Sequence, residues 1–260
     1  MDVTSRFAAI MAGPEAAIPL DEAALLVAAA VRPDLDVAAE RARLDEVAAA
    51  VWAPRLDALC KCLFDELGFA GDADDYYDLR NSCLDQVVER RLGIPITLSV
   101  LLVEVGRRVG VPLVGVSMPG HFLVRDELDP EVFVDAFAGG AVLDAAGCEA
   151  LFRDLHGPGA AFDPAFLRPV GARAIVARML ANLDGIATAR SDRVLLERVV
   201  RLRTLVPGAP APLHRRLAEV LASSCRFGEA ADVLDGLAAG DNDDAGGDAL
   251  AARRLRARLN

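Results

Sequence analysis

Apolar residues in the first 70 positions recur at helical spacing. In "PLDEAALLVAAAV", residues 19–31, Asp21 stands where an N-cap residue is expected, and Pro33 ends the pattern. The stretch 35–69 keeps apolar residues three and four positions apart, and Pro54 predicts a break or kink within it. The chain is therefore expected to begin with a helical region.

The next pattern predicts a buried central helix. Ser82 and Asp85 have the spacing of a capping box, which would start a helix that Gly93 then ends. Pro95 suits the first position of a following helix, where its missing N–H does no harm. That helix, expected over residues 96–109, is apolar nearly all round, which is typical of the centre of a domain.

After Gly110 the pattern changes from helical to extended. The runs "VPLVGVSM", "HFLVR", "EVFVDAF" and "AVLDA" are short, rich in β-formers and separated by Gly, Pro and acidic turns. They predict an antiparallel sheet. Helices, a buried central helix and then a sheet indicate an α+β domain that ends near residue 170.

Residues 171–260 return to a helical pattern with a weak internal repeat. A shift of 34 residues aligns Leu183 with Leu217 and Val199 with Val233. The second copy has small and aromatic residues in the order of a tetratricopeptide unit, whereas the first copy fits less well. The tail is expected to hold one and a half to two degenerate repeats.

These patterns predict an α+β protein of two domains. Residues 1–170 would form the first, with a helical N-terminal region over 1–70 and a core over 71–170. Residues 171–260 would form an all-α second domain. Charge changes at the same place, because the first part carries 14 basic and 28 acidic side chains and the second carries 14 and 11.

Composition excludes several partners. The net charge of −11 argues against nucleic acid, since binding to phosphate needs a positive field. The five cysteines are odd in number and scattered, and no secretory leader precedes them, which is typical of reduced thiols in a cytoplasmic protein. The longest apolar run near the N-terminus, Ala23 to Val31, is too short to span a membrane. No membrane is therefore expected as a partner.

A thiol-dependent site of the papain or transglutaminase type needs three groups. A cysteine begins a buried helix, a histidine on the adjacent sheet takes its proton, and a carboxylate on the next strand orients the imidazole. This sequence supplies the helix, His121 and Asp135. No cysteine begins the helix.

The block from Tyr76 to Arg125, "YYDLRNSCLDQVVERRLGIPITLSVLLVEVGRRVGVPLVGVSMPGHFLVR", and the later "VDAFAGG" resemble the SirB family of transglutaminase-like proteins. The resemblance covers essentially the whole chain and is densest from Tyr76 to Gly140. It implies a helical N-terminal region, a transglutaminase-like core of a buried helix on an antiparallel sheet, and tetratricopeptide-like C-terminal helices. Family members usually have proline where Leu79 and Ala136 stand here.

The resemblance also implies roles for three residues. His121 matches the histidine of active transglutaminase-like enzymes, and Asp135 matches their aspartate. Their nucleophile position falls on Pro95, fifteen residues before Gly110, and proline has no thiol, hydroxyl or N–H. "GIPI" is the usual pattern of the SirB family. The implied protein keeps two members of a catalytic triad and lacks the attacking one.

Two residues are alternative nucleophiles. Cys83 would occupy the first turn of a helix if Ser82 were its N-cap, and its pKa would then be depressed. Thr97 offers a hydroxyl near Pro95, although threonine nucleophiles need an unusual base. Either residue, with His121 and Asp135, would make a cysteine- or hydroxyl-dependent amide hydrolase or acyl transferase.

Other polar residues allow both a structural and a functional interpretation. His121 and Asp135 are either a buried stabilising pair or a surviving base or ligand contact. A set of residues either lines a groove beside His121 or serves turns and helix caps: Tyr76, Tyr77, Asp78, Asn81 and Thr97.

Glu104 interrupts the apolar central helix and needs a partner, for which Arg107, Arg108 and Arg125 are candidates. His156 and His214, expected in a loop and in a helical repeat, have no ligand-like neighbours in sequence. No zinc spacing and no Gly-rich phosphate loop occur, so no metal and no cofactor are expected.

The leading hypothesis is a non-catalytic transglutaminase-like protein that binds a protein or peptide partner. The region around Pro95, His121 and Asp135 would hold an extended peptide, and the start of the central helix would favour an anionic group such as a C-terminal carboxylate. The helical tail would present a second surface. A purely scaffolding role, and the enzyme with a relocated nucleophile, are the alternatives.

Overall fold

The computed structural model describes residues 2–240 and 243–259. The chain divides into two compact units, one of residues 14–179 and one that combines residues 1–13 with 180–260. α8 (Ala172–Ala189) begins in the first unit and ends in the second. The domain boundary that the charge pattern places near residue 170 stays a prediction.

The larger unit begins with the helices that the periodicity predicts. Helical structure is interrupted between residues 49 and 56, around Pro54. α2 starts at Leu20 with Pro19 as its N-cap residue, so the expectation of Asp21 as N-cap is wrong. Asp21 lies in the first turn of the helix, and its carboxylate forms an ion pair with Arg108. The elements are η1 (Glu15–Ala17), α2 (Leu20–Val31), α3 (Val37–Ala49), α4 (Leu56–Cys60) and the π-helical η2 (Lys61–Glu66).

α6 (Pro95–Val109) is the central helix of this unit, as the sequence predicts. Pro95 is its first residue, and Gly110 ends it with φ 81°, a left-handed conformation that favours glycine. α5 (Leu84–Arg90) precedes it, but the expected capping box is absent. Ser82 belongs instead to the 3-10 helix η3 (Leu79–Ser82), which Asp78 caps by accepting a hydrogen bond from the N–H of Arg80.

The extended runs form an antiparallel sheet in the order β6-β5-β4-β3-β7. Its register pairs Val116 with Leu123 and Val124 with Val134. The strands are β3 (Leu113–Val116), β4 (Leu123–Asp126), β5 (Phe133–Asp135), β6 (Ala141–Leu143) and β7 (Pro169–Val170). A separate parallel pair joins β1 (Ala70–Gly71) to β2 (Leu92–Gly93).

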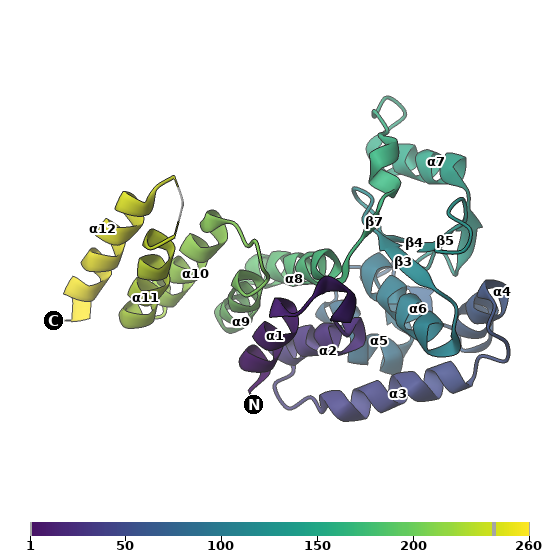
Figure 1. Cartoon of the computed structure of the whole chain (residues 1–260), viewed down its shortest axis with the longest axis horizontal. Helices are drawn as coiled ribbons and strands as arrows, with labels where there is room; N and C mark the ends of the chain where they lie inside the picture. The colour runs from purple at the N-terminus through teal and green to yellow at the C-terminus, as the bar shows by residue number, and fades with distance from the viewer. Residues whose placement is uncertain (1, 241–242, 260) are drawn as a thin grey trace. The chain divides into compact units, whose positions relative to one another are not determined.

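Helices cover both faces of the sheet (Figure 1). α6 contacts β3 and β4 on one face. α7 (Ala145–His156) packs on the other, where Cys148 and Phe152 join a cluster with Val116, Leu123 and Phe133. A further short helix, η4 (Pro164–Leu167), leads to β7. The fold is therefore α+β, as predicted.

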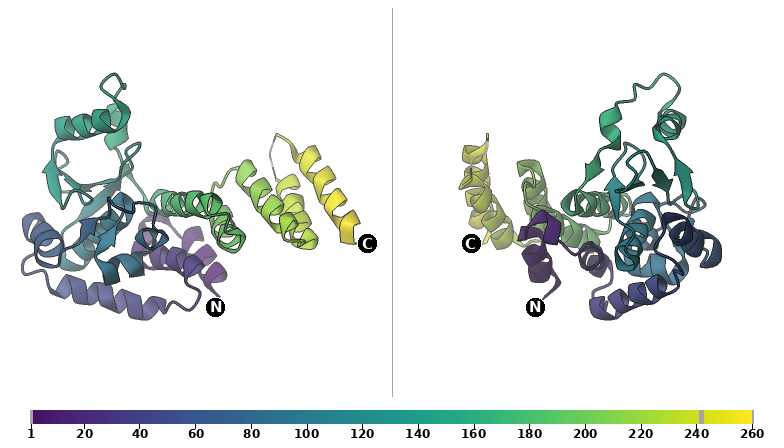
Figure 2. Two further views of the ribbon diagram at one scale, coloured as in Figure 1. Left: turned by 180° about the vertical axis from the view of Figure 1, so that it is seen from behind. Right: turned by 45° about the vertical axis from the view of Figure 1, so that its right-hand side comes forward.

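The smaller unit is all helical. α10, α11 and α12 lie side by side in the left view of Figure 2 and share a core that includes Leu217, Leu221 and Leu234. The helices are α1 (Val3–Ala12), α9 (Arg193–Thr204), α10 (Ala211–Ser223), α11 (Phe227–Ala238), α12 (Ala245–Arg256) and η5 (Ala257–Leu259). Across the described residues of both units, no helix is long and apolar enough to cross a membrane.

Candidate functional site

The start of α6 is held by the side chain of Thr97. Its Oγ accepts a hydrogen bond from the N–H of Ile94 at 3.1 Å and lies 2.7 Å from the carbonyl oxygen of Asn81, to which it donates. Pro95 and Thr97 are both buried. Because these bonds occupy the hydroxyl, Thr97 ties the helix to η3, and its proposed role as a nucleophile loses support.

His121 and Asp135 lie together where strand β4 begins and its neighbour β5 ends. A turn at Gly120 brings the chain into β4, and the N–H of His121 donates to the carbonyl oxygen of Met118 at 3.1 Å. Nε2 of His121 lies 2.9 Å from Oδ1 of Asp135, and both side chains are buried. This distance is short, but the geometry at Nε2 of the imidazole does not meet that of a hydrogen bond.

Asp135 also binds the backbone of the residues that follow it. Its Oδ1 accepts hydrogen bonds from the N–H groups of Phe137 (2.9 Å) and Ala138 (3.2 Å). The carboxylate thereby fixes the loop that follows β5. The predicted neighbours His121 and Asp135 are thus brought together, and one oxygen of the pair also shapes the loop beside it.

A series of contacts links this pair to the start of α6. Gly93 pairs with Gly71 across β1 and β2. A Cβ on Gly71 would come within 2.5 Å of the Phe137 ring, so glycine permits this close approach. The Phe137 ring centroid lies 6.2 Å from that of His121. Helix start, histidine and aspartate therefore belong to one region of the larger unit.

Asn81 and Asp78 hold the loop that precedes α5. Nδ2 of Asn81 donates to Oδ2 of Asp72 and to the carbonyl oxygen of Asp75, both at 2.9 Å, and its Oδ1 accepts from Arg90 at 2.9 Å. Hydrogen bonds from the Arg80 side chain lower the pKa of Asp78. The side chains of Asn81 and Asp78 therefore form hydrogen bonds that hold this loop, which supports a structural role for both residues.

Tyr76 and Tyr77 are the aromatic residues of the same loop. Their ring centroids lie 5.2 Å apart, and Tyr76 lies 6.0 Å from Phe137. Tyr77 is 74% exposed and Tyr76 37%. Burial raises the pKa of Tyr76. The two rings extend the region around His121 to the surface of the larger unit.

Arg178 of α8 is a member of this region that the sequence analysis does not identify. Its Nη1 donates to Oγ of Ser117 at 2.7 Å and to the carbonyl oxygen of Met118 at 3.0 Å. Its guanidinium lies over the Phe122 ring, 5.4 Å from the centroid. The only signal in the sequence is an arginine within an otherwise apolar helical turn, "IVARML".

Cys83 is not an activated thiol, which corrects the expectation of a depressed pKa. It is the N-cap residue of α5, fully buried, and Sγ donates to the carbonyl oxygen of Leu79 at 3.5 Å. Burial raises the pKa of Cys83 far above that of an ordinary thiol, and the nearby Asp85 adds to the effect. Burial likewise raises the pKa of Cys60 to about 12 and that of Cys148 to about 11.

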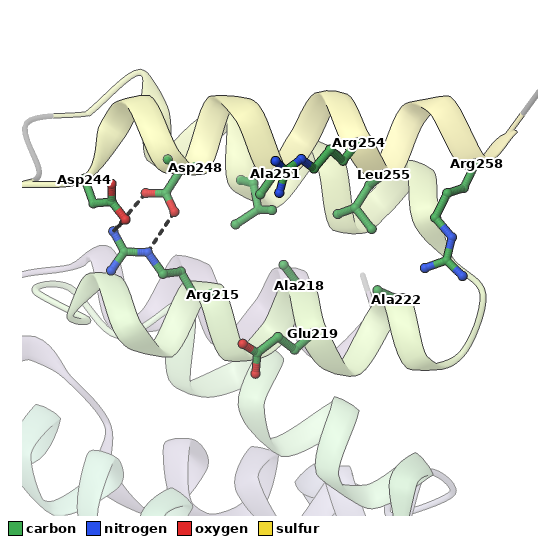
Figure 3. Close-up of a pocket in the computed structure, with 12 residues that line it drawn as sticks. Arg215, Ala218, Glu219, Ala222, Asp244, Asp248, Ala251, Arg254, Leu255 and Arg258 are labelled. Atoms are coloured by element: carbon green, nitrogen blue, oxygen red, sulfur yellow. Dashed lines mark hydrogen bonds and ion pairs between the residues drawn. The ribbon is translucent and has the colours of Figure 1, made fainter.

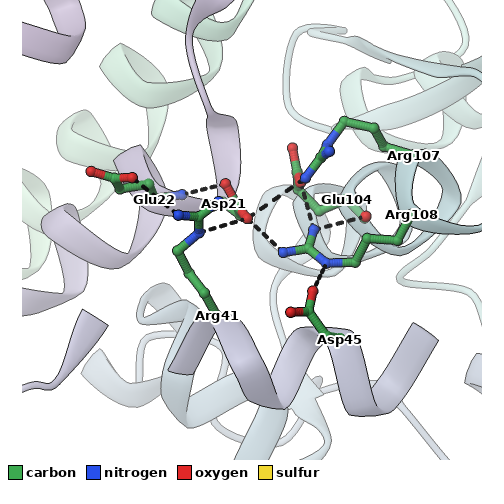
Figure 4. Close-up of polar contacts among 7 residues, drawn as sticks. All are labelled: Asp21, Glu22, Arg41, Asp45, Glu104, Arg107 and Arg108. Atoms are coloured by element: carbon green, nitrogen blue, oxygen red, sulfur yellow. Dashed lines mark hydrogen bonds and ion pairs between the residues drawn. The ribbon is translucent and has the colours of Figure 1, made fainter. Parts of the chain in front are cut away.

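Glu104 and Asp21 form a structural ion-pair network (Figure 4). Nη1 of Arg108 lies 2.8 Å from Oε2 of Glu104, and Nη2 lies 2.5 Å from Oδ2 of Asp21. Arg107 also contacts Glu104, at 2.9 Å. The predicted ion pair of Glu104 is confirmed with Arg107 and Arg108, whereas Arg125 has a buried Nε without a hydrogen-bond partner among the described residues.

The smaller unit holds a pocket of about 460 Å³ between α10 and α12 (Figure 3). Alanines from the two helices face it, and the ion pair of Arg215 with Asp248 (2.7 Å) closes one end. Arg254 of α12 and Arg258 of η5 also line the pocket. The tail therefore offers a concave surface with charged margins.

The remaining histidines show no sign of a metal site. His156 ends α7, not a loop as expected, and its Nε2 lies 3.0 Å from the carbonyl oxygen of Pro119. His214 lies in the helix α10, and its place in a repeat stays a prediction. Within the described part of the chain, no group of three or more His, Cys, Asp or Glu side chains is placed to hold a metal ion.

Comparisons with known proteins agree with this geometry. Residues 29–181 match the family model described as the transglutaminase-like superfamily. A UPF0162 protein of Xylella fastidiosa is 41% identical over 216 residues, 76% of each chain. One of Vibrio cholerae is 34% identical over 166 residues, 62% of this chain and 61% of that one.

A relative of a different kind is F-box only protein 21 of Mus musculus, which is 37% identical over 138 residues, 49% of this chain and 21% of that one. No solved structure matches the chain. Because the family match spans more than half of the sequence and includes α6, His121 and Asp135, the protein belongs to the transglutaminase-like superfamily.

Proposed function

We propose that this protein is a non-catalytic member of its superfamily, a pseudoenzyme, which binds an extended peptide of a partner protein beside His121. The observation that carries the proposal is the identity of the residue that begins α6. The resemblance to active transglutaminase-like enzymes implies a cysteine at this place, and here the buried Pro95 begins the helix. Without a nucleophile there, His121 has no thiol to deprotonate.

The enzyme with a relocated nucleophile finds little support. The thiol of Cys83 is buried with a raised pKa, and the hydroxyl of Thr97 already bonds to Ile94 and Asn81. A thiol attacks as its thiolate, so a raised pKa lowers the reactive fraction at neutral pH. An amide hydrolase or acyl transferase would need a nucleophile that these two residues do not supply.

Exposed aromatic rings favour a binding role for the same region. Tyr77 and Tyr76 stand at the surface next to Phe137, and tyrosine contributes large, rigid contact area to interfaces. The tail would add a second surface, as a SirB protein with tetratricopeptide-like helices would have. The pocket between α10 and α12 supports this part of the proposal.

Selection of a random peptide library on the immobilised full-length protein tests the proposal. Selected peptides should bind with lower affinity to Tyr77→Ala, by about tenfold for an aromatic contact at the centre of an interface. Leu128→Ala is the matched control, because Leu128 is also an exposed apolar residue of the larger unit, at 80%. This variant should bind as the wild type does.

Two results would contradict the proposal. The first is a library that yields no binding peptide, or peptides insensitive to Tyr77→Ala. The second is chemistry: mass spectrometry of each selected peptide after incubation with the protein should show it intact, and hydrolysis or transfer to an amine would identify an enzyme.

A further inference from the structure

Arg178 is a half-buried cation without an anionic partner. Nη1 bonds to the neutral Ser117 and Met118, and no carboxylate of a described residue forms an ion pair with the guanidinium. Burial lowers the pKa of Arg178, and the one opposing influence comes from Tyr76, which is a neutral side chain at pH 7. Removing a cation from water without pairing it costs free energy, so such an arginine is unusual outside a binding site.

Arg178 and His121 share one acceptor. The carbonyl oxygen of Met118 accepts hydrogen bonds from Nη1 of Arg178 at 3.0 Å and from the backbone N–H of His121 at 3.1 Å. The Phe137 ring lies 6.2 Å from the His121 ring, and the Tyr76 ring lies 6.0 Å from that of Phe137. The charge of Arg178 also opposes the rise in the pKa of Tyr76 that burial causes. We call Arg178, Tyr76, Phe137 and His121 the Arg178 cluster. It combines one cation, one phenol hydroxyl and aromatic rings beside the contact between His121 and Asp135.

We propose that the Arg178 cluster binds the C-terminal carboxylate of a peptide, with the guanidinium of Arg178 and the hydroxyl of Tyr76 as donors and the Phe137 ring against the terminal side chain. This inference rests on the proposed peptide-binding function and names the group that the site recognises. The planar guanidinium matches a carboxylate with two parallel N–H bonds. Nε and Nη2 of Arg178 remain for them, because Nη1 alone makes the bonds to the turn.

The start of α6, the anion site expected from the sequence, is less suitable. Pro95 has no N–H, and the N–H of Ile94 already donates to Thr97. Two of the groups that would bind an anion at a helix start are therefore missing or occupied. Arg178 supplies the positive charge in their place.

Charge and shape favour a carboxylate at a peptide end. One guanidinium balances the single charge of a carboxylate, whereas a phosphate dianion would keep one unbalanced charge in a half-buried site. In a C-terminal residue the carboxylate and the side chain leave the same Cα. One residue can therefore reach both Arg178 and the Phe137 ring, which an internal aspartate cannot do with its single side chain.

N-acetyl-phenylalanine is a minimal probe, and N-acetyl-phenylalaninamide differs from it only by the missing carboxylate. Each is titrated into the full-length protein while the Nε–H resonance of Arg178 is followed by NMR. The acid should shift this resonance to saturation, and the amide should not. Equal binding of acid and amide would overturn the proposal, as would tighter binding of inorganic phosphate than of the acid.

Variants separate recognition from folding. Arg178→Gln should weaken binding of the acid by about tenfold or more, the usual loss for a hydrogen bond to a charged group. Arg168→Gln removes an equal charge from an exposed side chain of the same unit and should have no effect. Tyr76→Phe leaves Arg178 and its bonds to the turn unchanged. This variant should weaken binding of N-acetyl-phenylalanine by a smaller factor. If neither Arg178→Gln nor Tyr76→Phe differs from Arg168→Gln, the cluster is not the site.

The probe also distinguishes this inference from the proposed function. Should the peptide library fail while N-acetyl-phenylalanine binds through Arg178, peptide binding is wrong and the carboxylate site stands. Library peptides that bind equally well with an amidated end would leave the binding function intact and refute the site. Amidated peptides that need an internal Asp or Glu would refute the assignment to the peptide end.

Discussion

Oγ of Thr97 donates a hydrogen bond to the carbonyl oxygen of Asn81 at 2.7 Å, and this single contact joins the start of α6 to the end of η3. Both groups are fully buried. The side chain of Asn81 is in turn bonded to Asp72 and Arg90, so the contact connects the central helix to the loop that carries Tyr76 and Tyr77.

Thr97→Val should lower the free energy of unfolding by about 1–3 kcal/mol, because it keeps the shape and leaves the carbonyl of Asn81 and the N–H of Ile94 unpaired in the interior. Thr97→Ser keeps the hydroxyl and should lose less. Urea unfolding followed by circular dichroism measures both. Equal stability of the valine and serine variants would contradict the assigned role.

Pro95→Cys should restore an activated thiol. A thiol at the first position of α6 would lie at the positive end of the helix, where the thiolate is stabilised. We expect iodoacetamide to modify the introduced thiol at pH 7 at least about tenfold faster than Cys83, measured by mass spectrometry of peptides. Adding His121→Ala to Pro95→Cys should slow the reaction. A rate that is independent of His121 would show that the imidazole does not face this position.

Because of its buried thiols, the protein should lose stability at alkaline pH. Burial raises the pKa of Cys60 from 9.0 to about 12 and that of Cys148 from 9.0 to about 11. Between pH 9 and 11 the unfolded chain loses these protons and the folded chain keeps them, so the free energy of unfolding falls as pH rises. The slope is at most about 1.4 kcal/mol per pH unit for each thiol.

Urea unfolding at pH 8, 9 and 10 measures that slope, and Cys60→Ser should reduce it. Arginine does not titrate in this range, so the other sources of the slope are the remaining thiols, the tyrosines and the single lysine. A Cys60→Ser variant with an unchanged slope would show that this thiol ionises equally in both states.

Asp21→Asn should destabilise the larger unit by about 3 kcal/mol, because Arg108 then remains buried with less compensation. Asp45→Asn, which removes the exposed partner of the same arginine, should cost less than about 1 kcal/mol. Urea unfolding at pH 7 compares the two variants. Similar losses would contradict the central place of Asp21 in the network.

The stabilising contribution of Asp21 should decrease at acid pH. Burial opposes the ionisation of Asp21, but hydrogen bonds from Arg108 and Arg41 outweigh it and lower the pKa below 3.8. The contribution of Asp21 is therefore complete above pH 3.8 and is lost as pH falls through the lower folded value. The wild type and Asp21→Asn should converge in stability as the pH falls below 3.8.

Local patterns were sufficient to predict most of the fold. Pro95 and Gly110 define α6 because both act through backbone geometry that needs no distant partner. The alternating apolar runs after Gly110 predict the strands β3 to β6, and the tail is helical as expected. His121 and Asp135 were paired correctly, since His121 lies two residues before β4 and Asp135 is the last residue of the neighbouring strand β5.

Features that depend on distant contacts could not be predicted. Cys83 follows a polar loop in the sequence, yet the core buries its thiol, and Asp21 resembles an N-cap until Arg108, 87 residues away, is seen beside it. Arg178 is equally hidden, because its significance comes from Tyr76 and Met118 and from the absence of a carboxylate partner among the described residues.

α1 belongs with the C-terminal helices, although more than 160 residues separate them along the chain. It contacts α9, and its Phe7 and Met11 are completely buried. A fragment that starts at residue 180 would consequently lack a native piece of its own hydrophobic interior, and trimming the amino terminus would damage the distant tail. Experiments that separate the two units should therefore supply residues 1–13 to the tail, for example by a circular permutation or a short covalent fusion.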